Sequence, residues 1–207
     1  MTNAMTNHQQ LIQAVEKADS PDRLIAAVRS LAAARHEAGI PTLIAALGYN
    51  NPAVAVTAME GLIQMGEAAV PLLLELLDGY NYGARAYAIR ALATIAEPRA
   101  LDVLLTAAEN DFAPSVRRAA SKGLGNLHWE RLEKSQIRPA QEQAFLTLVK
   151  VSQDSDWSIR YAAIVGLQAL ATQSHFQAKI LDLFQQIGTK ETDSAVRARV
   201  QLAINQF

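Results

Sequence analysis

A nine-residue pattern recurs along the chain and constrains the fold more than any other feature. Its clearest copies are residues 116–124 and 159–167, each with a branched apolar residue, Arg, a variable residue, two Ala, two variable residues, Gly and Leu. Weaker copies begin at positions 23, 54, 84 and 196. Self-similarity at a period of roughly 30 to 45 residues indicates a solenoid, in which each repeat is a structural unit stacked on its neighbours.

The segments around these copies carry the spacing of amphipathic helices. Apolar residues recur three and four positions apart in nearly every segment, and alternating strand patterns are missing. Short helices are marginal alone in water, whereas stacked pairs bury a continuous core. We therefore predict an all-α, right-handed α-α superhelix of about five HEAT-like helix pairs. It would form one domain over 1–207, with an N-terminal helix at about 7–18 and helix pairs over about 20–207.

The small residues of the pattern have a structural explanation. Ala and Gly at these positions let helix axes approach closely, whereas larger side chains would push the layers apart. They are expected at Ala119, Ala120, Gly123, Ala162, Ala163 and Gly166.

The longest interval between copies, from position 116 to position 159, contains a charged insertion at about 128–139. One interpretation is a solvated loop with a helical turn, and the other is a functional element. Trp129 lies in this insertion, and an exposed loop rarely holds a Trp that neither packs nor binds.

Composition excludes several classes of function. The chain has 50% hydrophobic and 19% charged residues, which is typical of a folded protein. It has no cysteine, and its four histidines show no ligand spacing, so a metal site is not expected. A net charge of -1 does not favour nucleic acid as a partner. No segment approaches the roughly 20 apolar residues of a membrane span, and the N-terminus lacks an apolar signal core, so a cytosolic protein is expected.

Acidic residues precede the repeated Arg and suggest a structural role for both. Asp156 lies four residues before Arg160, and Asp193 four before Arg197, so each Asp could cap a helix and meet an Arg of its own or a neighbouring layer. This structural role is favoured over ligand binding for the repeated Arg. Between Asp111 and Arg117 the spacing is six, which predicts a turn of different construction.

The variable positions of the pattern are more informative about function. They face away from the apolar side of the helix and would line the concave surface of a solenoid. The residues expected on this basic and aromatic strip are Tyr82, Arg85, Arg90, Arg118, Lys122, Trp157 and Tyr161. Such a strip suits a flat, anionic, conjugated ligand or a protein partner. Spacing alone favours the protein partner, because solenoids are mostly binding surfaces.

The repeat at 156–167 resembles the short HEAT-like repeats of the phycobilin lyase group. Residues 80–92, 98–102 and 111–120 are similar to the smaller, F-type subunit of the heterodimeric E/F phycocyanobilin lyases. The resemblance covers most of the chain and is best from about 80 to 167.

This resemblance implies an enzyme subunit of the cytoplasm of cyanobacteria or of the plastid stroma. With its E-type partner it would attach phycocyanobilin through a thioether to a cysteine of the phycocyanin alpha subunit, and it could also remove the bilin. The bilin would be a substrate, and no tightly bound cofactor is expected. A sister branch that isomerises the bilin is expected to carry a His-Cys motif, which a chain without cysteine cannot have.

For such a lyase, catalysis would consist mainly of positioning the tetrapyrrole, because the nucleophilic thiol belongs to the acceptor protein. Cations would hold the propionates, and aromatic rings would form stacking walls. The candidate bilin-binding residues are Tyr82, Arg85, Tyr87, Arg90, Arg117, Arg118, Trp157, Arg160 and Tyr161. Asp111 or Asp156 could meet the pyrrole nitrogens, and His128 is a candidate acid-base group.

Two alternatives remain open at this point. Most of the candidate residues could instead form the subunit interface. The chain could also be a non-catalytic HEAT-like adaptor or chaperone-like factor for phycobiliproteins, or a HEAT-like scaffold unrelated to them.

Overall fold

The computed structural model describes residues 6–77, 82–173 and 175–207, and no β-strand occurs within these ranges. The chain divides into two compact units, Met1–Ile95 and Ala96–Phe207, which are described separately below. The prediction that 1–207 form one repeat domain therefore stays a prediction.

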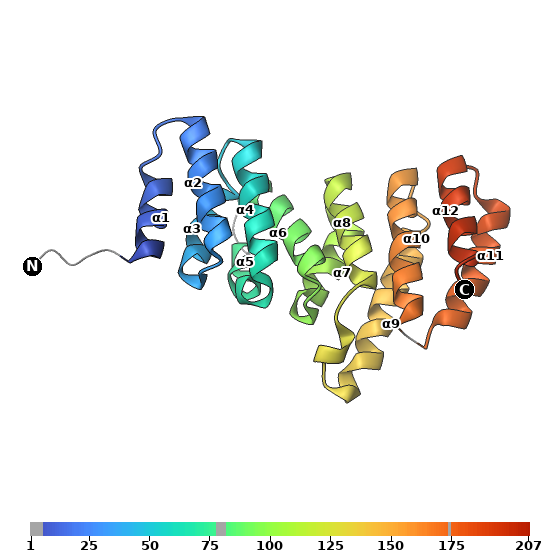
Figure 1. Ribbon diagram of the computed structural model, residues 1–207. Coiled ribbons are helices and arrows are strands. Elements are labelled where there is room, and N and C mark those ends of the chain that lie inside the picture. The colour runs from blue at the N-terminus through green and yellow to red at the C-terminus, as the bar shows by residue number, and fades with distance from the viewer. Residues whose placement is uncertain (1–5, 78–81, 174) are drawn as a thin grey trace, which may run out of the picture. The chain divides into compact units, whose positions relative to one another are not determined.

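In the first unit, α2, α4 and α6 follow one another in a layer, and α3 and α5 pack beside them (Figure 1). The N-terminal helix α1 packs on α2, in agreement with the predicted helix at about 7–18. The elements of this unit are α1 (Asn7–Glu16), α2 (Pro21–Ala34), η1 (Glu37–Gly39), α3 (Ile40–Ala46), α4 (Pro52–Met65), η2 (Gly66–Ala69), α5 (Val70–Leu76) and α6 (Tyr82–Ile95).

Local sequence signals set the helix starts in this unit. The Ser20 side chain accepts a hydrogen bond from the backbone N–H of Arg23, and Asn51 accepts from the N–H groups of Ala53 and Val54. In both helices a Pro follows the capping residue, where the missing N–H costs nothing. At the end of α4, Gly66 takes a φ of 62° and reverses the chain.

The segment Pro52–Leu76 is the one stretch of the described residues that is long and apolar enough to cross a membrane by length and composition. In the structure it is interrupted at Gly66 and forms α4, η2 and α5. Its residues Val54, Leu62 and Leu73 are fully buried in the first unit. This burial explains its apolar composition as that of a core helix pair.

The second unit repeats the same arrangement. Here α8 packs on α10 and α10 on α12, while α7, α9 and α11 pack against them (Figure 1). The elements of this unit are η3 (Pro98–Ala100), α7 (Leu101–Asn110), α8 (Pro114–Gly125), η4 (Trp129–Arg131), α9 (Lys134–Val151), α10 (Trp157–Thr172), α11 (Gln177–Lys190) and α12 (Ser194–Ile204).

The contact between α8 and α10 is unusually close because of two glycines. A Cβ atom on Gly125 would lie 1.9 Å from the carbonyl oxygen of Gly166, and a Cβ on Gly166 would lie 2.2 Å from the carbonyl oxygen of Ser121. No side chain fits at either distance, so the two backbones touch. At Gly166 this confirms the prediction that a small residue of the repeat allows the layers to approach.

The charged insertion at 128–139 is more ordered than a solvated loop. Its first part forms η4, and its second part, from Lys134 onward, belongs to α9, which has 18 residues against 10 in α7. The longest repeat interval therefore arises largely from a longer helix. Trp129 is 3% exposed and packs in the core of this unit, which answers the question of why the insertion contains it.

Candidate functional site

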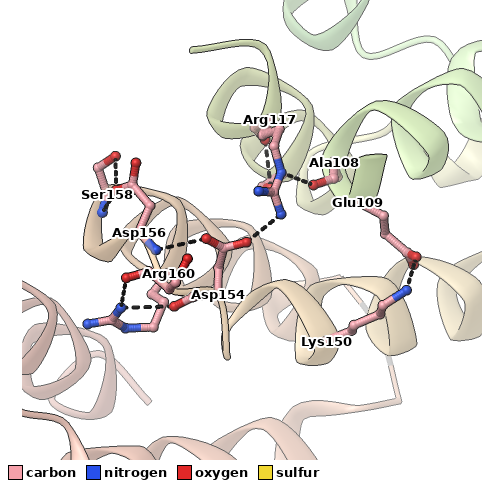
Figure 2. A network of polar contacts seen from close by, with 10 residues as sticks. Ala108, Glu109, Arg117, Lys150, Asp154, Asp156, Ser158 and Arg160 are labelled. Atoms are coloured by element: carbon pink, nitrogen blue, oxygen red, sulfur yellow. Dashed lines mark hydrogen bonds and ion pairs between the residues drawn. The ribbon is translucent and has the colours of Figure 1, made fainter. Parts of the chain in front are cut away.

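Two of the repeated arginines connect consecutive layers of the second unit, and Figure 2 shows the link from Arg117 to Asp154. The Arg117 guanidinium on α8 donates to the carbonyl oxygen of Ala108 at 3.1 Å and to the carboxylate of Asp154, in the turn before α10, at 2.5 Å. Arg160 on α10 donates to both carboxylate oxygens of Glu191, in the turn before α12, at 2.9 and 2.8 Å. Each Arg thus pairs with an acid of the next layer.

The acidic partners share a register that the sequence interpretation missed. Asp111, Asp154 and Glu191 each stand six residues before the Arg of their own repeat. Each also accepts the backbone N–H of the residue two positions further on, at 2.8 to 2.9 Å. The six-residue spacing is thus common to all three turns and does not distinguish the turn at Asp111, although this turn is built differently, as predicted. What differs there is Ala113, which replaces the capping Asp of the other two turns.

The Arg160–Glu191 ion pair perturbs the pKa values of both partners. The hydrogen bonds from Arg160 lower the pKa of Glu191 to about 2, and the Glu191 carboxylate in turn raises the pKa of Arg160. The Glu191 side chain is 6% exposed, so little solvent competes with the pair. The guanidinium groups of Arg117 and Arg160 are therefore engaged within the protein. This geometry favours their structural role over the alternative role in bilin binding.

Another part of the predicted strip converges on a groove in the second unit. The groove has a volume of about 610 Å³ and is lined by Arg118, Lys122, Trp157, Ser158, Tyr161 and Ala195. These residues come from α8, α10 and α12. Arg118, Lys122 and Tyr161 occupy variable positions of the repeat pattern, whereas the other three lie just before the pattern begins. Four of them, Arg118, Lys122, Trp157 and Tyr161, were expected on one surface, and the structure confirms that they meet.

The groove is basic on one side and aromatic in the middle. Arg118 and Lys122 lie on α8, and neither takes part in an ion pair among the residues that the structure describes. Trp157 and Tyr161 lie on α10, and the Trp157 side chain is 50% exposed. The α12 side contributes Ala195, which is small and apolar.

Asp156 lies at the edge of this groove as the capping residue of α10. Its carboxylate accepts from the backbone N–H of Ser158 at 2.8 Å and from the Ser158 hydroxyl at 2.7 Å. These hydrogen bonds, together with the charge of Arg118, lower the pKa of Asp156. Asp156 is therefore a carboxylate near neutral pH, which suits an acceptor role and not that of a proton donor.

The remaining candidates lie elsewhere. Asp111 accepts the Ala113 N–H in the turn before α8, and His128 is half-exposed beside Glu130, with Nδ1 and Oε1 3.4 Å apart. Neither lines the groove. Arg85, Tyr87 and Arg90 lie on α6 in the first unit, where the Arg90 guanidinium is 5.7 Å from the centre of the Tyr87 ring. The side chain of Tyr82 lies outside the described residues.

Sequence reasoning did not single out Ser158, although it lines the groove. The available signal was its position two residues after Asp156, where a hydroxyl can reach the capping carboxylate. Over the described ranges, no group of three or more His, Asp or Glu side chains is arranged to hold a metal ion.

Comparison with known proteins identifies the repeat fold and the family of this chain. A family model of HEAT repeats matches residues 9–83 and 70–137, which defines the class as a HEAT-repeat protein and confirms the predicted all-α solenoid fold. Phycocyanobilin lyase subunit beta of Nostoc sp. (strain PCC 7120) is 55% identical over 202 residues, covering 98% of this chain and 100% of the relative. The chain belongs to the family of these lyase subunits.

Two further matches support the same family. The phycocyanin alpha phycocyanobilin lyase CpcF of Synechocystis sp. is 49% identical over 193 residues, covering 93% of this chain and 90% of the relative. A chain in the solved complex of CpcE and CpcF of phycocyanin lyase from Nostoc sp. PCC7120 superposes with a TM-score of 0.77 at 57% identity. That match covers 81% of this chain and 99% of the solved one.

Proposed function

We propose that this chain is the F-type, or beta, subunit of a heterodimeric bilin lyase. With an E-type subunit it attaches phycocyanobilin to a cysteine of the phycocyanin alpha subunit and can also remove it. The relatives named as phycocyanobilin lyase subunits and the superposition on the complex of CpcE and CpcF support this proposal. The site of action is the cytoplasm of a cyanobacterium, or the stroma of a plastid.

The reaction requires the lyase to position the bilin, and it does not require a nucleophile on the lyase. The acceptor thiol adds across the ethylidene double bond of ring A, so that sulfur bonds to the exocyclic carbon and a proton goes to the ring carbon. The nucleophile is the acceptor's own cysteine, and this chain contains none. A lyase subunit accelerates such an addition by holding the tetrapyrrole in one conformation opposite that cysteine.

The groove lined by Arg118, Lys122, Trp157 and Tyr161 is the single observation that carries the bilin-binding part of this proposal. A bilin is flat, conjugated and carries two propionates. The two cations on α8 suit the propionates, and the aromatic side chains on α10 suit the pyrrole rings. Because neither cation is held by a carboxylate within the described protein, a ligand carboxylate does not have to displace one.

The other candidate residues take different parts in the proposal. Arg117 and Arg160 connect the layers, and Asp111 and His128 lie outside the groove. Asp156 acts as a carboxylate at the groove's edge. The residues of α6, Tyr82, Arg85, Tyr87 and Arg90, contact either the bilin or the partner subunit.

The test is reconstitution of the complete heterodimer with phycocyanobilin and the phycocyanin alpha subunit. Arg118→Ala and Tyr161→Ala should each abolish the covalent, zinc-fluorescent product while leaving heterodimer formation intact. Arg138→Ala, an exposed change on α9 outside the groove, is the matched control and should behave as the wild type.

Two results would contradict the proposal. If Arg118→Ala and Tyr161→Ala disrupt the heterodimer, the groove is an interface with the partner subunit. If the wild-type pair binds the alpha subunit but transfers no bilin, the chain is a non-catalytic adaptor.

A further inference from the structure

Ser158 connects a capping carboxylate on one helix to a cation on the next. Its hydroxyl donates to Asp156 at 2.7 Å, and its oxygen accepts from Nη1 of Arg118 at 3.0 Å. The direction of both bonds is fixed, because a carboxylate only accepts and a guanidinium only donates. A polarised chain therefore runs from Asp156 through Ser158 to Arg118, at the wall of the groove.

The hydroxyl is not needed to cap α10. The backbone N–H of Ser158 already donates to Asp156 at 2.8 Å, as Ala195 donates to Asp193 at 2.9 Å at the start of α12. Ala195 occupies the repeat position equivalent to Ser158 and has no hydroxyl. The same helix start thus forms without the Ser side chain.

The link to Arg118 is not needed to stack the layers either. That task falls to the residue before it, Arg117, which pairs with Asp154, and to Arg160, which pairs with Glu191. The positions equivalent to Arg118 in the later repeats are Tyr161 and Ala198, neither of which can reproduce the bond. The Asp156–Ser158–Arg118 chain therefore occurs once among these repeats, and it occurs at the groove.

We infer that Ser158 is a positioning residue that sets the Arg118 guanidinium for a carboxylate of the bound ligand. An Arg side chain has many rotamers, and a side chain that is not held in place loses this freedom on binding. The bond to Ser158 holds one Nη group of this side chain in place before a ligand binds. No other hydrogen bond of the Arg118 side chain is found among the described residues, so its remaining N–H groups are available to a ligand carboxylate in the groove.

This inference rests on the proposed function, because it assigns the ligand carboxylate to a propionate of the bilin. Preorganisation of this kind raises affinity and fixes the ligand's pose. Ser158 does not contact the reacting atoms, and its effect passes through Arg118.

The experiment titrates the intact heterodimer with phycocyanobilin and follows its absorption spectrum. Ser158→Ala should weaken binding by about 3- to 10-fold, which is less than the full loss of a hydrogen bond to a charged group, because the Arg118 guanidinium itself remains. The absorption maximum of the bound bilin should shift as well, because its pose is less restricted. Ser158→Thr keeps the hydroxyl and should restore both affinity and spectrum.

A second arm separates this inference from the function on which it rests. In an Arg118→Ala background, Ser158→Ala should have no further effect on affinity. If Arg118→Ala alone leaves bilin binding unchanged, the proposed groove is wrong. If Arg118→Ala weakens binding but Ser158→Ala matches the wild type in affinity and spectrum, Ser158 does not position Arg118. A loss of thermal stability that Ser158→Thr fails to rescue would assign Ser158 a structural role only and overturn the inference.

Discussion

At the scale of single residues, Glu191 and Arg160 form an ion pair that connects two layers of the second unit. The Glu191 side chain is nearly buried, and both its oxygens accept from one guanidinium. Such bidentate pairs are short and directional. They also make folding depend on pH, because the carboxylate must remain ionised.

Glu191→Gln should lower the free energy of unfolding at pH 7 by up to about 3 kcal/mol, since the pKa of Glu191 falls from 4.5 to about 2 and each pKa unit is worth about 1.4 kcal/mol. The native pKa is depressed, so the contribution is fully present above pH 4.5. It is lost as the pH falls through about 2. Urea unfolding of both proteins at several pH values measures the difference.

The matched control for this change is Glu142→Gln, an exposed position on α9. It should leave the free energy of unfolding within about 0.5 kcal/mol of the wild type at every pH. If Glu191→Gln is equally destabilising at pH 2 and pH 7, the carboxylate charge is not the cause.

At the scale of helices, a repeated Arg forms an ion pair between layers where an acidic side chain of the following turn reaches it. Arg160 has the Glu191 carboxylate of the next turn as its partner. Arg197, its equivalent on α12, is exposed and makes a long hydrogen bond of 3.4 Å to the carbonyl oxygen of Glu191. The two positions therefore provide a comparison within one chain.

Arg160→Ala should destabilise the protein by about 3 kcal/mol, because it leaves a nearly buried carboxylate without its cation. Arg197→Ala should stay within about 0.5 kcal/mol of the wild type. Thermal or urea unfolding measures both. Equal losses would mean that the Arg acts within its own helix and not between layers.

The glycines of α10 and α11 make a second comparison at this scale. Gly166→Ala should destabilise by about 2 to 3 kcal/mol, because its Cβ would lie 2.2 Å from the Ser121 carbonyl oxygen. At Gly188 a Cβ would lie 3.6 Å from Val200, an ordinary contact. Gly188→Ala should therefore stabilise by up to about 1 kcal/mol through helix propensity.

Unfolding in urea distinguishes the two glycine variants directly. If Gly166→Ala is tolerated as well as Gly188→Ala, the α8 and α10 backbones do not touch in solution.

The sequence predicted the helices and the groove better than the ion pairs. Helical spacing and Pro turns locate elements through local chemistry, and the variable positions of a repeat must share one face, so Arg118 and Tyr161 could be placed together. The partner of Arg160 could not be found in this way. A long side chain reaches across layers, and the acid four residues away, Asp156, was the nearer candidate in sequence. Ser158 was missed because a Ser near a cap is common.

At the scale of the whole molecule, a chain of net charge -1 presents a locally basic groove. A basic groove could bind either the two carboxylates of a bilin or the partner subunit, so an experiment has to distinguish the two. Since the chain has no cysteine, one introduced thiol reports on one position.

Ala195→Cys, at the α12 side of the groove, should react readily with a maleimide both alone and in the heterodimer. Phycocyanobilin should slow that reaction, because it fills the groove. Ser135→Cys, exposed on α9, should react equally fast with and without the bilin. Mass spectrometry of this chain measures the rates. Loss of Ala195→Cys labelling on heterodimer formation alone would show that the partner covers the groove.

The backbone contact between Gly125 and Gly166 has a consequence for how such subunits can diversify. This contact sets the spacing of α8 and α10 through backbone atoms. The side chains that line the groove take no part in it. Substitutions at Arg118, Lys122 or Tyr161 therefore change the surface without moving the walls that carry it. A scaffold built in this way can acquire a preference for a different pigment by a few surface replacements, whereas a side chain at either glycine would disturb the packing of α8 on α10.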